Sequence, residues 1–351
     1  MNRLATFMHI SDLHVGTVDP LSLNAANAWW MRFPILDGYL GHSERALFAL
    51  DRRFAALKKE SAELIITGDL TTCGKDVEFQ LFDTYVGAQP SARSLNYMGL
   101  RNPGWEKMAI PGNHDHWPGT IAILGSPRGM VYRIFNDLPR VSPLISIGNG
   151  YQVRFIWINS DVDVGHRSMH RGLARGGCFS HLEYLETQMP ALDEKEIRVL
   201  CMHHSPSYRG SGPLWSLEID QKSRNRVSEF IIDHRISVVL CGHLHSPPYV
   251  HPELAISGAR RASFLEARCG STSQIKPSDL LSSVKRKLRS RGLLPRERTN
   301  TLLVHRVIED QGSVNWETEI NLLYPGKFDK PTSTRLVNGQ EVTVNFRVWP
   351  P

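Results

Sequence analysis

Short apolar runs recur along the chain, and most of them stop abruptly at polar residues or glycine. Leu64–Thr67, for example, is followed by Gly68-Asp69, which is typical of a buried strand that ends in a loop. The runs that predict strands are 5–10, 64–67, 107–110, 152–158, 198–202, 238–240, 262–267, 302–307 and 316–322. The last three follow one another without long helices between them.

Amphipathic stretches separate the earlier runs. Leu47, Leu50 and Phe54 recur at helical spacing and Ser43 is a candidate N-cap, so we predict a helix over 44–59. The remaining predicted helices are 76–87, 180–189 with a capping box at Ser180–Glu183, 220–234 and a short segment at 280–289.

Strands that alternate with helices imply an α/β fold with helices on the outer faces of the sheets. We expect one large domain over 1–275, interrupted by a long insertion at 17–42. A basic segment and C-terminal strands over 276–351 are expected to complete or extend the second sheet. Loops as long as 17–42 are usually functional lids or partly ordered.

Composition narrows the class of protein. With 351 residues, 41% hydrophobic and 22% charged, the chain is neither disordered, collagen-like nor a coiled coil. No run reaches the roughly 20 apolar residues that cross a bilayer, so we expect no membrane association. Five cysteines without a CxxC pair argue against a disulfide framework and for buried thiols in a reduced, cytoplasmic compartment.

The basic charge is local. The chain carries a formal net charge of +6, yet the segment from Arg260 to Arg298 contains eleven basic residues against Glu266, Asp279 and Glu297. The rest of the chain is therefore close to neutral. A charge run of this kind is typical of a solvated face or of a surface that binds a polyanion.

Candidate metal ligands stand at the ends of five predicted strands. Ligands in open α/β sheets bind at the carboxyl ends of strands, so these side chains are expected to converge. Oxygen and imidazole donors without cysteine suit two divalent ions such as Mn²⁺, Fe²⁺ or Zn²⁺. In chain order the blocks are Asp12-Leu13-His14, Gly68-Asp69, Gly112-Asn113-His114-Asp115, His203-His204 and Gly242-His243-Leu244-His245.

The spacing within the blocks supports one shared site. Alternate residues of an extended segment, as in Asp12-x-His14, face the same way, and the single carboxylate of Asp69 can bridge two ions. Glycine before Asp69, Asn113 and His243 permits backbone conformations that other residues resist. Each block alone also fits a turn, a capping pair or a core histidine. The ordered set of five is what indicates a metal site.

In this order the blocks resemble the calcineurin-like metallophosphoesterase superfamily, whose pattern is D-x-H, G-D, G-N-H-D/E, H and G-H-x-H. The resemblance covers about residues 5–275 and implies a four-layer αββα sandwich, in which helices flank two packed mixed β-sheets. The chain looks most similar to the bacterial class III cyclic-nucleotide and glycerophosphodiester phosphodiesterase branch. There the fourth block often reads His-His-Pro; here it is His203-His204-Ser205-Pro206.

Carried over to this sequence, the resemblance implies a role for each motif residue. The first ion would be held by Asp12, His14, Asp69 and His245, and the second by Asp69, Asn113, His203 and His243. We take His203 rather than His204 as the ligand because it directly follows the strand. His114 would lie over the substrate as a non-ligand histidine, with Asp115 as the carboxylate that orients it.

The implied activity is metal-dependent hydrolysis of phosphodiesters or phosphomonoesters. A metal-bridged hydroxide would attack phosphorus, and His114 would protonate the leaving group as general acid. The expected partner is a small phosphoester, with His204, Tyr208 and Arg209 as candidate substrate contacts. His116, His166 and His170 either border the substrate pocket or lie on the surface. The oligomeric state stays open.

Two other hypotheses remain. A nuclease acting on DNA or RNA would use Lys285-Arg286-Lys287 and Arg289 to follow a phosphate backbone, although the basic segment has no aromatic residue except Phe264 for stacking bases. A non-catalytic scaffold would be expected to have lost ligands, and here none is missing. Protein phosphatase and nucleotide pyrophosphatase activities also stay open, because fold analogy does not choose a substrate.

Overall fold

The computed structural model describes most of the chain. The described residues are 1–16, 40–87, 99–119, 129–165, 174–210, 217–245, 248–276, 279–290, 299–324, 327–330 and 341–349. Residues 17–39 of the predicted insertion, as well as His166 and His170, lie outside these ranges.

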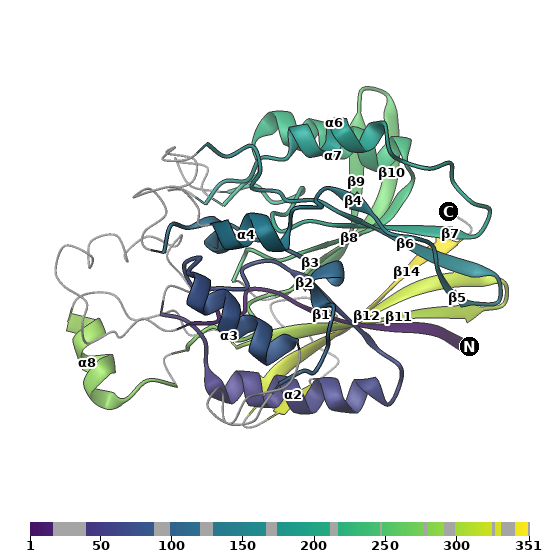
Figure 1. Cartoon of the computed structure of the whole chain (residues 1–351). Helices are drawn as coiled ribbons and strands as arrows, with labels where there is room; N and C mark the ends of the chain where they lie inside the picture. The colour runs from purple at the N-terminus through teal and green to yellow at the C-terminus, as the bar shows by residue number, and fades with distance from the viewer. Residues whose placement is uncertain are drawn as a thin grey trace.

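Two mixed sheets form the centre of the described structure, each with seven strands (Figure 1). The first sheet contains β1 (Asn2–Ile10), β2 (Glu63–Thr67), β3 (Ala109–Ile110), β11 (Thr301–Asp310), β12 (Ser313–Tyr324), β13 (Lys327–Asp329) and β14 (Thr343–Trp349). Its order is β13-β12-β11-β1-β2-β3, and β14 also pairs with β12. Strands β1, β2 and β3 run parallel, whereas β11 is antiparallel to β1.

The second sheet contains β4 (Arg140–Val141), β5 (Ile145–Gly148), β6 (Tyr151–Trp157), β7 (Glu196–Cys201), β8 (Ile236–Cys241), β9 (Tyr249–Ser257) and β10 (Arg260–Arg268). Its order is β4-β6-β7-β8-β10-β9, and β5 also pairs with β6. Strands β6, β7, β8 and β10 are parallel to one another, so their carboxyl ends share one edge of the sheet.

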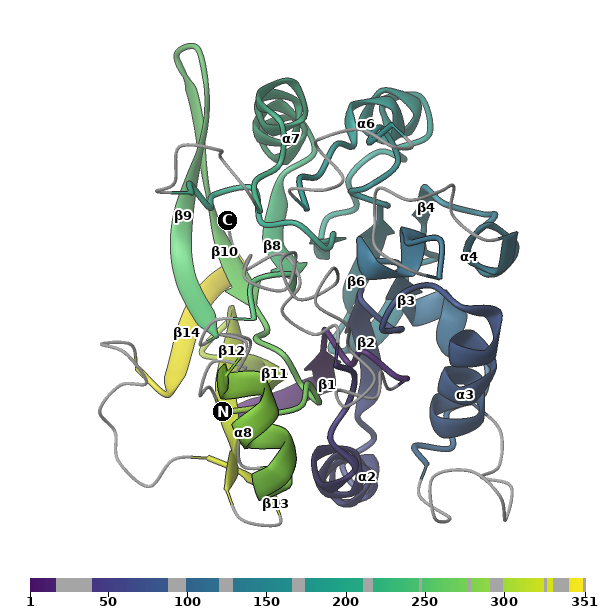
Figure 2. The ribbon, with the colours of Figure 1, turned by 90° about the vertical axis from the view of Figure 1, so that its left-hand side faces the viewer.

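Helices cover the outer face of each sheet (Figure 1, Figure 2). Helices α2 and α3 lie on the first sheet, and α6 and α7 lie on the second. The helices of the described residues are α2 (Glu44–Lys58), α3 (Asp76–Val86), α4 (Gly129–Ile134), α6 (Phe179–Glu186), α7 (Gln221–Asp233) and α8 (Ser282–Ser290), with 3₁₀ turns η3 (Trp105–Met108) and η4 (His114–His116).

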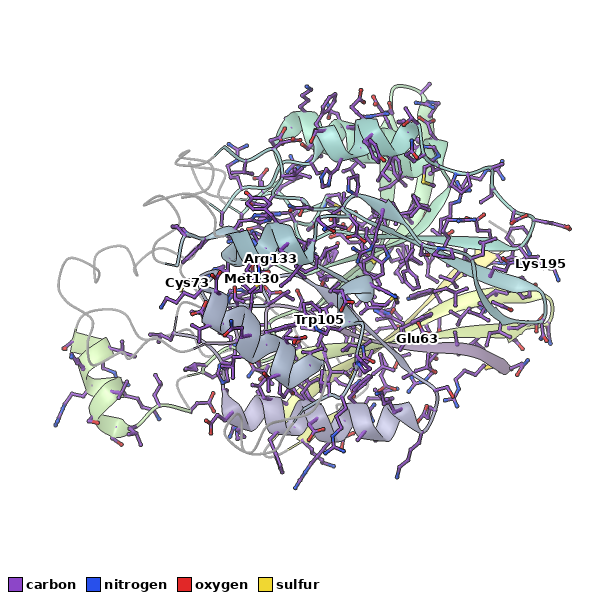
Figure 3. All side chains as sticks on the ribbon, viewed as in Figure 1. Glu63, Cys73, Trp105, Met130, Arg133 and Lys195 are labelled. Atoms are coloured by element: carbon purple, nitrogen blue, oxygen red, sulfur yellow. The ribbon has the colours of Figure 1, made fainter. Side chains whose placement is uncertain are left out.

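The period-two alternation of the strands builds three apolar cores between these four layers. In β1, Phe7 points into the core between the sheets while Met8 points into the core under α2. In β7, Val199 points between the sheets while Leu200 joins the core under α7. Side chains fill the space between the layers, and buried Trp105 adjoins α3 (Figure 3). The predicted αββα sandwich is confirmed.

Most predicted elements are confirmed, with two corrections. The strand expected at 107–110 shrinks to the two residues of β3, because Lys107 lies in the 3₁₀ turn η3. Helix α6 begins at Phe179, before the supposed cap, and Ser180 lies inside its first turn. There the Ser180 hydroxyl donates to Asp163 at 2.5 Å instead of capping the helix.

The C-terminal strands return to the start of the chain. Strand β11 pairs with β1 along most of its length, and β12, β13 and β14 extend the sheet from there. They therefore complete the sheet that contains the N-terminal strand. No helix in the described ranges is both long and apolar enough to cross a lipid bilayer. All five cysteines are buried and free, as predicted.

Helix α2 offers a matched test of the core under the first sheet. Phe54 is 1% exposed whereas Phe48, on the same helix, is 42% exposed. We expect Phe54→Ala to lower the free energy of unfolding by about 3–5 kcal/mol. Phe48→Ala should cost less than about 1 kcal/mol. Urea denaturation followed by circular dichroism measures both, and equal losses would contradict the four-layer packing.

Candidate metal centre

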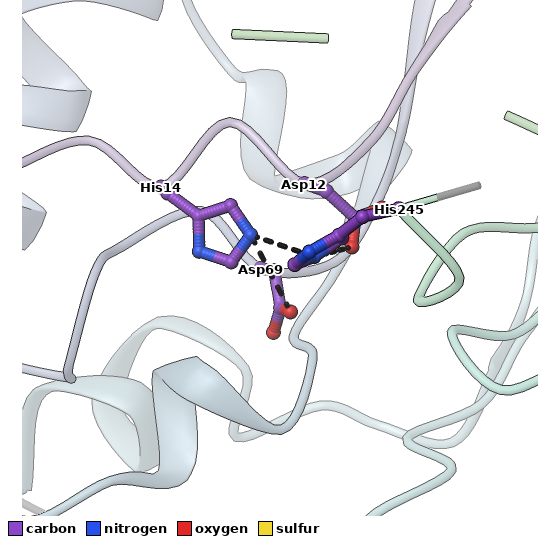
Figure 4. Close-up of side chains that lie close together, drawn as sticks. All are labelled: Asp12, His14, Asp69 and His245. Carbon is purple, nitrogen blue, oxygen red and sulfur yellow. Dashed lines mark hydrogen bonds and ion pairs between the residues drawn. The ribbon is translucent and has the colours of Figure 1, made fainter. Parts of the chain in front are cut away.

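The seven predicted ligands come from loops at the carboxyl ends of five strands, β1, β2, β3, β7 and β8. Because these strands lie side by side in two sheets that face each other, their loops meet at one end of the sandwich. The ligand atoms form two groups, and both groups include Asp69. Within each group, all ligand atoms lie within 4.8 Å of one another. The first is Asp12, His14, Asp69 and His245 (Figure 4), and the second is Asp69, His203 and His243.

The first group directs four ligand atoms at one point. His14 Nε2 lies 2.9 Å from His245 Nε2, and His245 Nε2 lies 3.0 Å from Asp12 Oδ1. Asp69 Oδ2 is 3.9 Å from His14 Nε2. These side chains are buried, and neither Asp12 Oδ1 nor Asp69 Oδ2 accepts a hydrogen bond. Unpaired carboxylate oxygens beside converging imidazole nitrogens fit a divalent cation.

The second group adds an amide oxygen. His203 Nε2 lies 3.4 Å from Asp69 Oδ2 and 3.2 Å from Asn113 Oδ1. His243 Nδ1 lies 3.0 Å from the same Asn113 oxygen. The Asn113 side-chain oxygen therefore lies beside the second group, and its role as a ligand stays a prediction. Asp69 Oδ2 faces both groups, so one carboxylate can serve two ions.

The backbone at the candidate ligands is in an uncommon conformation. Asp12, His14, Asp69 and His243 have φ angles of 53°, 50°, 50° and 69°. Side chains other than glycine seldom occupy this left-handed region, and such residues gather at functional sites. The surrounding hydrogen bonds hold these angles. The Asp12 and His14 N–H groups, for example, donate to the carbonyls of Gly68 and Asp69 at 3.0 Å.

The three predicted glycines act in two different ways. Gly68 has a φ of 99°, as its expected conformational role requires. Gly112 and Gly242 are not in the left-handed region, so the expectation of a special conformation is wrong for them. They provide space instead. A Cβ on Gly112 would lie 2.3 Å from Asp69 Oδ1, and one on Gly242 would lie 1.8 Å from a serine hydroxyl.

Backbone carbonyls orient the imidazoles. The Nδ1–H of His203 donates to the Thr67 carbonyl at 2.7 Å, so its Nε2 lone pair can bind a cation beside the oxygens of Asp69 and Asn113. The Nδ1–H of His114 donates to the Thr72 carbonyl at 2.7 Å. The His114 ring also stacks on Trp117 with 4.0 Å between ring centroids.

Asp115 does not orient His114, contrary to the prediction. Its carboxylate accepts hydrogen bonds from the N–H groups of Leu70, Thr71 and Gly112 at 2.8–3.0 Å. The side chain therefore ties the loop after β2 to the loop after β3. The short loop between Asn113 and Asp115 turns the carboxylate back toward its own strand end, and the Thr72 carbonyl takes the place beside the imidazole.

Charge is shared unevenly within the cluster. Burial alone would raise the pKa of Asp69, but the charges of His203 and His114 hold that pKa well below its ordinary value. Burial would lower the pKa of His203, whereas the Asp69 carboxylate raises it to about 9. Burial and then the charge of Asp69 raise the pKa of Asp115 to about 7. Of Asp69 and Asp115, Asp69 is therefore the carboxyl group that carries the negative charge.

The candidate substrate contacts have different environments. His204 is fully buried, its Nδ1 lies 2.9 Å from Ser160 Oγ, and its ring packs against that of His243 with 4.2 Å between centroids. Tyr208 is half-buried, and its ring lies 5.9 Å from the Arg268 guanidinium. Arg209 is exposed. The structure thus selects His203 for the cluster and leaves the contacts of these three residues with substrate as predictions.

Two serines form a clamp behind the end of the first strand that was not predicted from the sequence. The Ser271 hydroxyl donates to the Asp12 carbonyl at 3.0 Å, and the Ser273 hydroxyl donates to the Leu13 carbonyl at 2.5 Å. Small polar residues in a connecting segment give no signal of this kind in the sequence.

A buried carboxylate, Glu266, was also missed. It accepts from the Ser205 hydroxyl at 2.6 Å and from the Ser207 N–H at 3.3 Å, so it fixes the loop after His203. Ser205, inserted relative to the His-His-Pro pattern, is thus the residue that this carboxylate holds. An acidic residue inside the apolar run 262–267 was the available signal.

A family model described as calcineurin-like phosphoesterase matches residues 5–247, a span that includes every candidate ligand. The chain belongs to the calcineurin-like phosphoesterase family. Members of this family are metal-dependent phosphoric ester hydrolases, which agrees with the buried Asp and His cluster. No curated protein shows significant sequence similarity to the chain.

Two solved structures are similar to this calcineurin-like chain. The purple acid phosphatase PPD1 from yellow lupin (Lupinus luteus) seeds has a TM-score of 0.52 and 11% identity, over 97% of this chain and 53% of that one. A putative 5′-nucleotidase from Staphylococcus aureus has a TM-score of 0.40 and 14% identity, over 95% and 56%. The chain thus spans about half the length of each, and the lupin enzyme supports the fold.

The two overlapping groups predict different metal losses for different substitutions. In Mn²⁺ titrations of chelator-treated protein, we expect two ions per chain. Asp69→Ala should abolish tight binding of both, because both groups share its carboxylate. His245→Ala and His243→Ala should each leave one ion. His251→Ala, at an exposed position on β9, is the matched control and should leave two. Two tightly bound ions in Asp69→Ala would contradict this arrangement.

Proposed function

We propose that this protein hydrolyses phosphodiesters or phosphomonoesters at a dinuclear metal centre. The observation that carries the proposal is the position of Asp69 Oδ2, which faces both ligand groups in a fully buried cluster. Asp12, His14, Asp69 and His245 would hold one ion, and Asp69, Asn113, His203 and His243 would hold the other. Mn²⁺, Fe²⁺ or Zn²⁺ suits these donors.

The bound ions would lower the pKa of a water molecule and neutralise the phosphate oxygens in the transition state. The chain's own residues would position the reaction. Attack of water forms one P–O bond while the P–O bond to the alcohol breaks, and the departing alkoxide needs a proton. His114 would supply that proton from Nε2, since its Nδ1–H is already committed to the Thr72 carbonyl.

The resemblance to the class III phosphodiesterase branch favours a diester as substrate. His204, Tyr208 and Arg209 would contact it, in agreement with their position in and after the loop that Glu266 fixes. Asp115 would act as a positioning residue, because it joins the loops that carry Asp69 and Asn113.

Nucleic acid is the second candidate substrate. Helix α8 carries Lys285, Arg286, Lys287 and Arg289, and it lies toward the end of the molecule where the strand-end loops gather (Figure 1). It has no aromatic residue on which a base could stack. We therefore rank a nuclease below a phosphoesterase for small substrates.

The first assay compares bis-p-nitrophenyl phosphate with p-nitrophenyl phosphate on Mn²⁺-loaded protein. We expect hydrolysis with a preference for the diester, and loss of that activity in Asp69→Asn, because the amide removes the shared negative charge. A monoester preference would overturn the diester assignment. Hydrolysis of neither substrate would contradict the proposed function as a whole.

The role of His114 has a separate test. His114→Ala should slow diesters with alkyl leaving groups by about 10²–10⁴-fold, because an alkoxide needs the proton. Nitrophenyl esters should slow far less, since nitrophenolate leaves without one. His251→Ala serves as the exposed control. Equal slowing of both ester types would remove His114 from the role of general acid.

A further inference from the structure

A row of buried polar side chains crosses the first sheet, on the face that packs in the core between the two sheets. It passes over four neighbouring strands, β12, β11, β1 and β2 (Figure 2). In that order its members are Trp316 with Thr318, His305, His9 and Thr67. All five side chains are 0% exposed. Polar groups in such a core cost free energy unless they are hydrogen-bonded.

The first member of the row fixes the direction of its hydrogen bonds. An indole nitrogen can only donate, and Trp316 Nε1–H donates to His305 Nδ1 at 3.0 Å. A neutral imidazole has one donor and one acceptor nitrogen, so His305 Nε2–H donates to His9 Nδ1 at 3.3 Å. For the same reason His9 Nε2–H donates to Thr67 Oγ1 at 2.8 Å. The Thr318 hydroxyl lies 2.9 Å from His305 Nδ1.

Both imidazoles of the row are neutral, as this direction requires. Burial lowers the pKa of His9 to about 3. Burial, and then the neighbouring His9, lowers the pKa of His305 well below its ordinary value. A protonated ring carries N–H on both nitrogens and could not accept the hydrogen bond from the member before it. The row is therefore a satisfied network that runs one way, from β12 to β2.

The row ends at the residue that leads β2 into the candidate metal centre. Thr67 is the last residue of β2, and the shared ligand Asp69 follows two residues later. The Thr67 carbonyl accepts hydrogen bonds from His203 Nδ1–H at 2.7 Å and from the Ser11 hydroxyl at 3.0 Å. One residue is thus held from the core by its side chain and holds a candidate ligand with its backbone.

The side chain and the carbonyl of Thr67 are mechanically linked. Threonine is branched at Cβ and has few allowed rotamers, so a hydroxyl fixed by His9 also restrains the backbone of Thr67. A rotation of that backbone would turn the carbonyl and, with it, the ring of His203. His203 Nε2 lies 3.4 Å from Asp69 Oδ2, and this distance would change with the ring.

The link reaches the second ligand group rather than the first. His203 belongs to the second group. In the first group, the imidazoles of His14 and His245 lie 2.9 Å apart, and His245 also contacts Asp12 at 3.0 Å. A change in the row should therefore alter the two groups unequally.

We propose that the row from Trp316 to Thr67 positions the second ion, because it fixes the backbone that orients His203. His9, His305 and Thr67 act through His203 and are positioning residues. The proposal rests on the proposed function, since it requires the second ligand group to bind an ion. Partners that orient metal-binding histidines typically change metal affinity by about 10–100-fold when they are altered.

Thr67→Val tests the proposal, because valine keeps the shape of the side chain and removes the acceptor of the His9 N–H. Thr67→Ser retains the hydroxyl and should bind metal like the unaltered protein. Thr6→Val is the matched control: Thr6 is 3% exposed on β1, and its hydroxyl has no hydrogen-bond partner.

Mn²⁺ titrations of chelator-treated protein are made in two backgrounds, each of which retains one ligand group. In His245→Ala, which retains the second group, we expect Thr67→Val to weaken Mn²⁺ binding by about tenfold or more. In His243→Ala, which retains the first group, the affinity should stay within about twofold. Thr6→Val should leave both affinities unchanged.

The possible outcomes separate the two proposals. Equal weakening in both backgrounds, or no weakening in either, would overturn the positioning role while the dinuclear centre stands. Failure of His245→Ala to bind any Mn²⁺ would instead overturn the dinuclear centre itself.

Nuclear magnetic resonance of the chelator-treated protein, with nitrogen-15 in its histidines, gives a readout that does not depend on metal. Thr67→Val should move the Nδ1–H proton resonance of His203, because the hydrogen bond to the Thr67 carbonyl changes. Thr6→Val should not move it. An unchanged His203 resonance in Thr67→Val would break the link between the row and the ligand, and so overturn the proposal.

Discussion

The negative charge of Asp69, held in the interior, is the constraint on which the centre depends. One carboxylate oxygen accepts a hydrogen bond from the backbone N–H of His114 at 2.8 Å. The other oxygen faces His14 and His203 and accepts no hydrogen bond. A buried carboxylate is costly unless it is compensated. Compensation here comes from His14, His114 and His203, which lie in the loops after β1, β3 and β7, so these three loops are positioned around one carboxylate.

The backbone is strained at four of the candidate ligands, and the packed sheets next to their loops stabilise that conformation. Four candidate ligands adopt left-handed angles, and such residues cost of order 1–3 kcal/mol each. Three apolar cores, the hydrogen bonds donated by Ser271 and Ser273, and those accepted by Asp115 hold the loops that carry them. At Asp12 and His14 these angles show that the segment is not extended, contrary to the expectation from the sequence, although both side chains still reach the same ligand group.

The fold and the cluster were largely predictable because both rest on local patterns. Apolar runs marked nine of the strands, and donor residues followed five of them directly in sequence. Strands β4, β5, β9, β13 and β14 escaped prediction: β4 and β13 are very short, and β9 and β14 have few buried positions. The orientation of Asp115, the clamp from Ser273 and the Glu266 contact were not predictable either. Each depends on a partner far away in the chain, and sequence spacing carries no information about such a partner.

The pairing of β1 with β11 has a consequence for how the protein is made. Of the described strands β1 is made before all others, yet one of its two edges is covered only by a strand that begins at Thr301. Until then that edge is open, and unpaired edges of apolar strands are sites of aggregation. The loop of Asp12 and His14 likewise lacks Ser271–Ser273 until late in synthesis. A nascent chain that stops near residue 247, where the family match ends, would hold all its candidate ligands and still leave the first strand half-paired.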